Sequence, residues 1–319
     1  MILLVHPFGN ANVRAVLAAL DGADRLGKFL TTLGWSNSSP ILQALPENVR
    51  REMMRRGYDL PIAYWQTTQR LLLEEAGRYP EWEPTLGGTR DSEKKLARKT
   101  RELELAETVI CPSAFVLGSL PEQARLTKKC MIAPFGSPLH GTYESHRTEK
   151  PLRFLFAGAL SQRKGLADLF AAMKLVKSSN LELVVMGSPI LPMEFYRNQF
   201  AHFIYEPPRA HAAVLRLMGS CDVLVLPSIV EGRALVQQEA MASGHPLIVT
   251  QNAGGEDLIV EGETGFLVLP GSPRAIAEKI EWFFENRDKL PGMRVATRAK
   301  AAELTWRAYG DKILHAIGS

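Results

Sequence analysis

Cysteine and long apolar segments are both scarce in this sequence. Its three cysteines, Cys111, Cys130 and Cys221, show no C-x-x-C spacing, which favours reduced, buried thiols over disulfides or a metal site. No segment approaches the run of about 20 apolar residues that a membrane-spanning helix needs, and the N-terminal MILLVHPFG is short for a signal peptide and lacks its basic lead. The sequence therefore predicts a cytoplasmic protein, with peripheral contact on the inner face of the membrane left open.

An excess of charge of one sign is also missing. The 38 Lys and Arg residues nearly balance the 34 Asp and Glu residues, and the resulting net charge of +4 does not argue for nucleic acid as a partner. The densest basic run, RREMMRR at 50–56, fits a solvated helix face better than a contact with acidic lipid or a substrate phosphate.

Familiar patterns of nucleophilic or metal catalysis are not evident either. The sequence shows neither a Ser-His-Asp spacing nor a cluster of metal ligands, so no metal site is expected. His245 stands between Gly244, which is expected to stop a helix, and an apolar run, which predicts a structural role for this histidine.

The second half of the chain alternates between short apolar runs and amphipathic segments. This alternation is typical of strands and helices in turn, and it predicts a doubly wound parallel sheet. The expected strands lie at 152–158, 181–187, 202–207, 222–227 and 246–250, and the expected helices at 165–177, 210–219, around Glu239 and at 273–287. Such sheets bind ligands at the carboxyl ends of their strands, where Gly158, Gly187 and Gly232 fall.

The first half is less regular, although 319 residues suffice for two domains of about 150 residues each. ILLVH followed by GNANVRAVLAAL predicts a strand, a loop and a helix, and TVICPSAFVLGSL with MIAPFG predicts a second such unit. The charged tract at 61–107 offers few strands, so this Rossmann-like domain is expected to be short and incomplete. A linker-like stretch at 135–151 separates the expected domains, 1–145 and 146–303.

Two glutamates, Glu231 and Glu239, bracket the segment that joins the last two expected strands. The loop EGRAL brings a helix N-terminus, with unpaired N–H groups and a partial positive charge, to the edge of the sheet, where Gly232 lets an anion such as a diphosphate approach. Because helical side chains lean toward the N-terminus, Glu239, about one and a half turns in, is expected at the same edge. Its carboxylate suits the paired hydroxyls of a ribose, and Glu231 could hold sugar hydroxyls.

A second segment converges on this edge. After the first strand of the second half, SQRKG places Arg163 and Lys164 just before a helix, so that two cations and another helix dipole can meet the same anion. Two positioned cations can neutralise a leaving diphosphate without a metal ion. Taken singly, each of these charged side chains fits an ordinary solvated surface; taken together, at the ends of two strands of one sheet, they favour a binding site.

Three segments of the second half resemble the donor-binding domain of the family-four retaining glycosyltransferases, which have the GT-B fold. They are FAGALSQRKGLADLFAAM, CDVLVLPSIVEGRALVQQEAMASGHPLIVTQNAGGEDLI and EGETGFLVLP. The E-x7-E motif of that family, followed by A-M-A-x-G-x-P, matches Glu231 through Pro246 with the correct spacing. In the first half, ELAETVICPSAFVLGSL resembles the segment ahead of the family's hinge. LTWRAYGDKILHAI resembles the C-terminal helix that crosses back to the first domain, here 304–319.

The resemblance implies an α/β protein with two Rossmann-like domains facing across a cleft, the first of them reduced. It implies that Arg163 and Lys164 contact the diphosphate of a nucleotide-sugar donor, Glu239 the ribose and Glu231 the donor sugar. The expected donor-binding residues are Gly9, Gly158, Arg163, Lys164, Glu231, Gly232, Ala234, Leu235 and Glu239, with Arg163, Lys164 and Glu231 also expected to act in catalysis. Backbone groups of Ala234 and Leu235 would meet phosphate, and Gly9 would lie across the cleft.

Three departures from the family pattern concern the cleft. Arg233 and Ala234 stand where the family usually has Phe-Gly, which would place a bulky charge beside the donor. No histidine occurs between His6 and His140, although many relatives have one near the reacting sugar. The first domain is also expected to lack one or two strand–helix units around 56–59.

The function implied is a retaining transfer of a sugar from a nucleotide-diphosphate sugar, without a bound metal or other cofactor. The acceptor could be a saccharide, a lipid-linked group or a small molecule, and nucleic acid is not expected. The alternative is a non-catalytic relative that binds a nucleotide sugar or a partner protein through a degenerate acceptor domain. A nucleotide-sugar epimerase is a weaker third choice, because the acid and base residues it would need across the cleft are not located.

Overall fold

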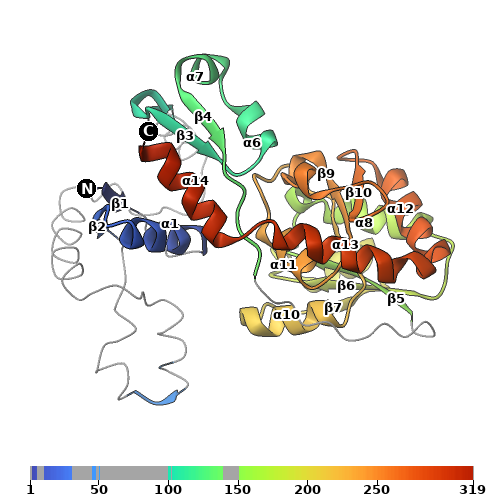
Figure 1. Cartoon of the computed structure of the whole chain (residues 1–319). Helices are drawn as coiled ribbons and strands as arrows, with labels where there is room; N and C mark the ends of the chain where they lie inside the picture. The colour runs from blue at the N-terminus through green and yellow to red at the C-terminus, as the bar shows by residue number, and fades with distance from the viewer. Residues whose placement is uncertain are drawn as a thin grey trace. The chain divides into compact units, whose positions relative to one another are not determined.

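The computed structural model describes residues 2–5, 11–30, 45–47, 50, 100–101, 103–138 and 151–318. The chain divides into two compact units (Figure 1). One unit combines Met1–Val109 with Trp306–Ser319, and the other spans Ile110–Thr305. Residues 110–138, which were expected in the first domain, therefore group with the second half of the chain. The functional division into 1–145, 146–303 and 304–319 stays a prediction, as does the shortening of the first domain.

The unit that holds the N-terminus contains a parallel β-α-β arrangement. It consists of β1 (Ile2–Val5), α1 (Ala11–Gly22) and β2 (Leu26–Leu30), which confirms the strand and helix expected at the start of the chain. The last helix, α14 (Trp306–Gly318), packs against α1. A Cβ atom at Gly310 would lie 2.8 Å from that of Ala19, so glycine permits this close approach of the two helices. Leu314 and Ile317 cover the cluster formed by Val13, Leu17, Leu20 and Leu26.

Residues 108–132 form the second group of strands and helices expected in the first half of the chain. Its elements are β3 (Thr108–Cys111), α6 (Ala114–Ser119), α7 (Glu122–Thr127) and β4 (Lys129–Ile132), and β3 pairs with β4. Ser113 begins α6 as its N-cap, because its hydroxyl accepts a hydrogen bond from the N–H of Val116 at 3.2 Å.

The second half of the chain forms a parallel six-stranded sheet. Its strands are β5 (Leu152–Ala157), β6 (Leu181–Met186), β7 (Ile204–Glu206), β8 (Val223–Leu226), β9 (Leu247–Thr250) and β10 (Gly265–Val268). They lie in the order β10-β9-β8-β5-β6-β7. Both faces of such a sheet must be covered, and the strands are accordingly almost continuous apolar runs. The doubly wound α/β fold expected from the sequence is confirmed.

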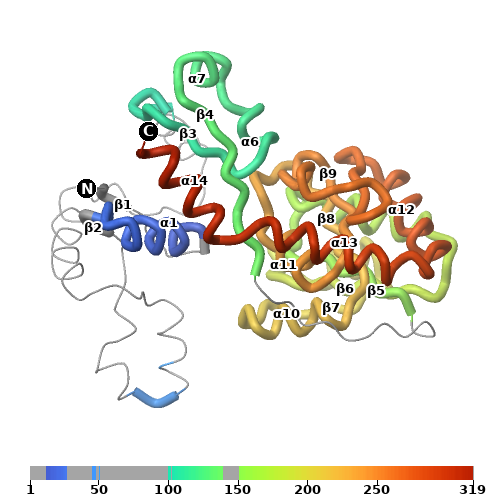
Figure 2. The backbone as a smooth tube through the Cα atoms, in the orientation of Figure 1, coloured from blue at the N-terminus to red at the C-terminus, as the bar shows by residue number. Residues whose placement is uncertain are grey.

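Helices cover the two faces of this sheet (Figure 2). They are α8 (Leu166–Leu175), α9 (Met193–Gln199), α10 (His211–Gly219), α11 (Leu235–Ala242), α12 (Pro273–Glu285) and α13 (Leu290–Ala302). From β5 the chain builds outward through β6 and β7, and from β8 it builds the other way through β9 and β10. Because crossovers between parallel strands are right-handed, α8 and α11 are placed on opposite faces. α8 packs with α12, and α11 packs with α13.

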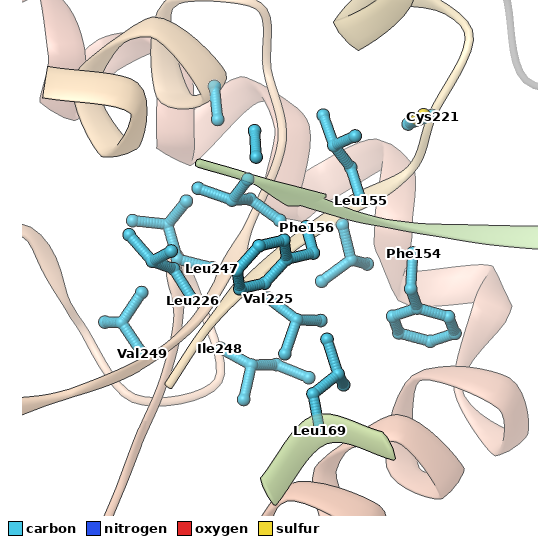
Figure 3. Close-up of a cluster of buried hydrophobic side chains, with 14 of the residues drawn as sticks. Phe154, Leu155, Phe156, Leu169, Cys221, Val225, Leu226, Leu247, Ile248 and Val249 are labelled. Atoms are coloured by element: carbon cyan, nitrogen blue, oxygen red, sulfur yellow. The ribbon is translucent and has the colours of Figure 1, made fainter. Parts of the chain in front are cut away.

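The core lies between these layers (Figure 3). Phe154 and Phe156 of β5, Val225 of β8 and Ile248 of β9 are fully buried. Phe154 meets the ring of Phe283 edge to face at 6.4 Å between centroids, which fixes α12 on the sheet. α12 begins with proline in its first turn and then turns an apolar stripe to the core, as its 3.6-residue period predicts.

A reversal of strand order, as between β5 and β8, opens a crevice at the carboxyl ends of those strands. The loop after β5 approaches the end of β8 very closely there. Gly165 has a φ of +75°, and a Cβ atom at this position would lie 1.9 Å from the carbonyl oxygen of Pro227. The N–H of Ile229 donates to the carbonyl oxygen of Arg163 at 2.9 Å, which joins the two loops.

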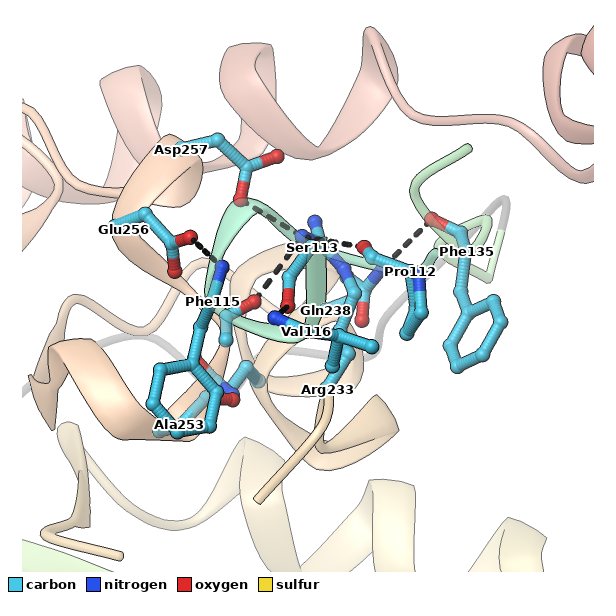
Figure 4. A network of polar contacts seen from close by, with 12 residues as sticks. Pro112, Ser113, Phe115, Val116, Phe135, Arg233, Gln238, Ala253, Glu256 and Asp257 are labelled. Carbon is cyan, nitrogen blue, oxygen red and sulfur yellow. Dashed lines mark hydrogen bonds and ion pairs between the residues drawn. The ribbon is translucent and has the colours of Figure 1, made fainter. Parts of the chain in front are cut away.

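Arg233 fastens residues 110–138 to the loops that follow β8 and β9 (Figure 4). Its guanidinium donates to the carbonyl oxygens of Pro112 at 3.3 Å and Gly254 at 3.1 Å, and pairs with the carboxylate of Asp257 at 2.7 Å. The Arg233 side chain has no exposed surface. These contacts explain why residues 110–138 group with the second half of the chain.

Three further contacts cross the same boundary. The N–H of Phe115 donates to Glu256 at 2.9 Å, and the hydroxyl of Ser113 donates to the carbonyl oxygen of Gly232 at 2.7 Å. The side-chain amide of Gln238 donates to the carbonyl oxygen of Phe135 at 2.6 Å. Residues 110–138 are therefore held at several points along their length.

Among the helices that the structure describes, none has both the length and the hydropathy needed to cross a bilayer. The run RREMMRR, apart from its first residue, lies outside the described residues.

Replacing Gly165 by alanine tests the close approach of the two loops. We expect Gly165→Ala to lower the free energy of unfolding by at least about 1 to 2 kcal/mol, the cost of a left-handed alanine alone, because its Cβ also meets Pro227. Gly292→Ala in α13 is the matched control: nothing lies within 4 Å of its added Cβ, and alanine favours a helix by up to about 1 kcal/mol. Chemical denaturation followed by circular dichroism measures both. Equal midpoints for the two variants would contradict the constraint.

Replacing Arg233 by methionine tests the fastening of residues 110–138. We expect Arg233→Met to lower the free energy of unfolding by about 2 to 4 kcal/mol, because two carbonyl oxygens and the Asp257 carboxylate lose their donor. Lys300→Met, which removes an ion pair to the exposed Glu303, should change it by no more than about 0.5 kcal/mol. Denaturation curves that do not distinguish these two variants would count against the fastening role.

Candidate functional site

Two loops meet at the reversal of the sheet. The first follows β5 and contains the 3-10 helix η2 (Gln162–Lys164), and the second follows β8 and runs to the start of α11 at Leu235. Gly158 comes directly after β5, and its N–H donates to the carbonyl oxygen of Met186 at the end of β6. Since the strands are parallel, both loops leave the sheet at its carboxyl edge, as the sequence predicted.

The loops bring Arg163, Lys164 and Glu231 together. Nη1 of Arg163 donates to Oε2 of Glu231 at 2.7 Å and to the carbonyl oxygen of Val230 at 3.2 Å. Nζ of Lys164 pairs with the same carboxylate oxygen. The Lys164 and Glu231 side chains are only 12% and 18% exposed, whereas that of Arg163 is 54% exposed. Two cations and one anion leave a net positive charge on the cluster. Water screens the charge of Lys164 least, because its side chain is the least exposed of the three.

The backbone beneath this cluster is held from several sides. The N–H of Glu231 donates to the carbonyl oxygen of Asn252, and the side-chain amide of Asn252 donates to that of Ile229 at 2.8 Å. Gly254, with a φ of +65°, passes so close that a Cβ there would lie 2.1 Å from the carbonyl oxygen of Gly232. The position of Glu231 is therefore set by backbone contacts before any ligand binds.

The start of α11 carries backbone N–H donors that no side chain caps. Ala234 is its N-cap and Leu235 its first residue. The first N–H groups of a helix lack intrahelical partners and carry the positive end of its dipole. The expected phosphate contact by the backbone of Ala234 and Leu235 thus has donors to use, and stays a prediction.

Glu239 lies further along α11, with a side chain that is 20% exposed. Its Oε1 is 2.9 Å from Nε2 of His211, the first residue of α10. Among the described residues, no hydrogen bond or ion pair joins Glu239 to Arg163, Lys164 or Glu231. The site therefore has two parts: the cation cluster after β5 and β8, and the Glu239–His211 pair.

The Arg233 side chain, expected to place a charge beside the donor, is buried among neighbouring groups, and its effect on the donor stays a prediction. This side chain is fully buried and contacts Pro112, Gly254 and Asp257. A buried guanidinium needs acceptors: here two carbonyl oxygens and the Asp257 carboxylate all meet Nη1, whereas Nε and Nη2 have no hydrogen-bond partner among the described residues. Gly9, expected across the cleft, lies outside the described residues.

His245 is a structural residue. It is fully buried between α11 and β9, with Nε2 at 2.5 Å from the carbonyl oxygen of Met218. Burial and the nearby Arg294 guanidinium lower the pKa of His245 to about 4. The imidazole is therefore neutral near pH 7.

Sequence reasoning missed the residues that hold the site in place. Ser113 and Asn252 lie in segments that resemble the family, but nothing singled them out there, and His211 lies outside those segments. Each lies far along the chain from the residue that it contacts. Across the described part of the chain, no group of three or more His, Cys, Asp and Glu side chains is gathered so as to hold a metal ion.

Comparison with known sequences places this site in a family. Residues 143–302 match the family model described as glycosyl transferases group 1. D-inositol 3-phosphate glycosyltransferase of Corynebacterium diphtheriae is 28% identical over 226 residues, which cover 66% of this chain and 50% of that protein. The capsular polysaccharide biosynthesis glycosyltransferase CapM of Staphylococcus aureus is 32% identical over 133 residues, 40% of this chain and 35% of CapM. The chain thus spans about half the length, or less, of these curated relatives.

Solved structures agree with the fold. Sucrose-phosphate synthase from Thermosynechococcus elongatus superposes with a TM-score of 0.68 at 19% identity, covering 98% of this chain and 97% of that one. Anabaena HepE in complex with UDP gives a TM-score of 0.68 at 16% identity, covering 99% of each chain. At such identities these neighbours establish the GT-B fold alone. Since the family model spans half of the chain and includes Arg163, Lys164, Glu231 and Glu239, the protein belongs to the group 1 glycosyltransferases.

Proposed function

We propose that the protein is a retaining glycosyltransferase that moves a sugar from a nucleotide-diphosphate sugar to an acceptor without a bound metal ion. The observation that carries this proposal is the meeting of Arg163 and Lys164 with Glu231 at the reversal of the sheet. Two cations beside a helix start without a side-chain cap can bind a diphosphate. The chain belongs to a glycosyltransferase family, which supports a diphosphate as the leaving group.

Each half of the donor has a proposed place. The diphosphate contacts Arg163, Lys164 and the backbone at Ala234 and Leu235, with Gly158 and Gly232 leaving room for it. The donor sugar lies by Glu231, whose carboxylate accepts from sugar hydroxyls.

The nucleoside extends to the second part of the site. There the carboxylate of Glu239 accepts from the hydroxyls of the ribose. Because an ionised carboxylate only accepts, this contact favours a ribonucleotide over a 2′-deoxyribonucleotide.

The charges explain how the bond to the leaving group could break. As the bond between the anomeric carbon and the diphosphate oxygen lengthens, negative charge grows on the diphosphate. Fixed cations stabilise that charge without having to reorganise. In the retaining mechanism that the family resemblance implies, the leaving diphosphate takes the proton of the acceptor hydroxyl, which attacks from the same face, so no side-chain nucleophile is required.

Relatives guide the choice of donor to test first. Anabaena HepE has been crystallised with UDP and with UDP-glucose, and its chain has the same fold. UDP-sugars are therefore the first candidates here, followed by GDP- and ADP-sugars. A protein that binds a donor but neither hydrolyses nor transfers its sugar would be the non-catalytic relative instead.

Glu239→Ala tests the ribose contact. Calorimetric titration with UDP, GDP and ADP should show that the variant binds the preferred diphosphate about 1 to 3 kcal/mol more weakly than the unmodified protein, the range for a lost hydrogen bond to a charged group. Glu278→Ala, which removes an exposed glutamate from α12, should leave the affinity unchanged. No binding of any of the three by the unmodified protein would refute the donor site.

Lys164→Met tests the cation cluster. Because Lys164 is the less exposed cation, its loss should lower kcat/KM for donor hydrolysis or transfer by about 10² to 10³. Arg163→Met should lower kcat/KM by a smaller factor, because water screens the charge of this more exposed side chain. Lys174→Met, at an exposed position of α8, serves as the control. Equal activity of the Lys164 and Lys174 variants would rule out this role.

A further inference from the structure

We propose that His211 is a positioning residue of the donor site, which holds the carboxylate of Glu239 in the orientation that receives the ribose. The inference rests on the proposed function and adds to it a residue that lies outside the E-x7-E motif. Its basis is the contact of 2.9 Å between Nε2 of His211 and Oε1 of Glu239.

The contact joins two helices that come from different crossovers of the sheet. His211 is the first residue of α10, which leads from β7 to β8, and Glu239 lies in α11, which leads from β8 to β9. The two residues are 28 positions apart, so the pair exists only because the sheet brings α10 beside α11. An ionised carboxylate only accepts hydrogen bonds, so Nε2 of His211 carries the hydrogen.

The pair suits a positioning role because glutamate is flexible. A free glutamate side chain loses rotamer entropy when a ligand fixes it, and that loss weakens binding. A hydrogen bond from His211 fixes Oε1 in advance. Among the described residues no group bonds to Oε2, which can accept from a ribose hydroxyl. At 60% exposure, the imidazole itself gains little from burial, so the contact with Glu239 is the main interaction that places it.

The experiment is a double-mutant cycle in the full-length protein. His211→Ala is made alone and together with Glu239→Ala, and the dissociation constants are measured by calorimetry with UDP and with 2′-deoxy-UDP, or with the matching GDP or ADP pair if the unmodified protein prefers that base. His211→Gln keeps a side-chain N–H donor. His202→Ala, which removes an exposed imidazole beside the ring of Phe200, is the matched control.

We expect His211→Ala to weaken binding of the ribonucleotide about 3- to 10-fold, the equivalent of one hydrogen bond, and His211→Gln to restore most of it. In the Glu239→Ala background the same substitution should change binding by no more than about 2-fold, because a residue that acts through Glu239 has nothing left to hold. The KM for the donor should rise with kcat nearly unchanged.

Two results would overturn the inference while leaving the donor site intact. One is that His211→Ala binds the nucleoside diphosphate as tightly as the unmodified protein does, while Glu239→Ala binds it weakly. The other is an equal loss from His211→Ala with and without Glu239, which would mean that the imidazole touches the ligand itself. Failure of the unmodified protein to bind any of the three nucleoside diphosphates would instead refute the proposed function.

Discussion

The close approach of the loop after β5 to the end of β8 is the constraint on which the site depends. Gly165 permits it, because any side chain there would meet the carbonyl oxygen of Pro227. These loops meet where the strand order of the sheet reverses. They follow β5 and β8, the two neighbouring strands from which the chain builds the sheet in opposite directions. Arg163 and Lys164 reach Glu231 because the backbones that carry them are already joined there.

Other close backbone contacts hold the loops around Arg163, Lys164 and Glu231. Asn252 holds the loop after β8 at Ile229, and Gly254 and Ser113 both approach the carbonyl oxygen of Gly232. A site that must stabilise charge gains from groups that do not move when the charge develops. The carboxylate of Glu231 and its two cations are thus supported by backbone contacts that reach into residues 110–138, a segment well separated from them in sequence.

Much of the second half could be predicted from its sequence, since β5, β6, β8 and β9 are apolar runs and α12 has a clear helical period. α9, β10 and α13 could not. α9 is seven residues long and rich in polar side chains, β10 is four residues long and opens with glycine, and α13 starts with Leu-Pro-Gly and carries few large apolar residues. The E-x7-E motif indicated Glu231 and Glu239, and the segment SQRKG indicated Arg163 and Lys164. Neither the inward turn of Arg233 nor the contact of His211 with Glu239 could be predicted, because both depend on partners that only the fold brings near.

The packing of α14 on α1 has a consequence for how the protein is made. Leu17 and Leu20 of α1 belong to a cluster that Leu314 and Ile317 complete, yet the six-stranded sheet and its helices come between them along the chain. On a ribosome, residues 110–305 therefore emerge before α14 does. The sheet can acquire its native packing during synthesis, whereas the apolar face of α1 waits uncovered until the residues of α14 have been added. Until then, part of the apolar surface of α1 is left to solvent or to a chaperone.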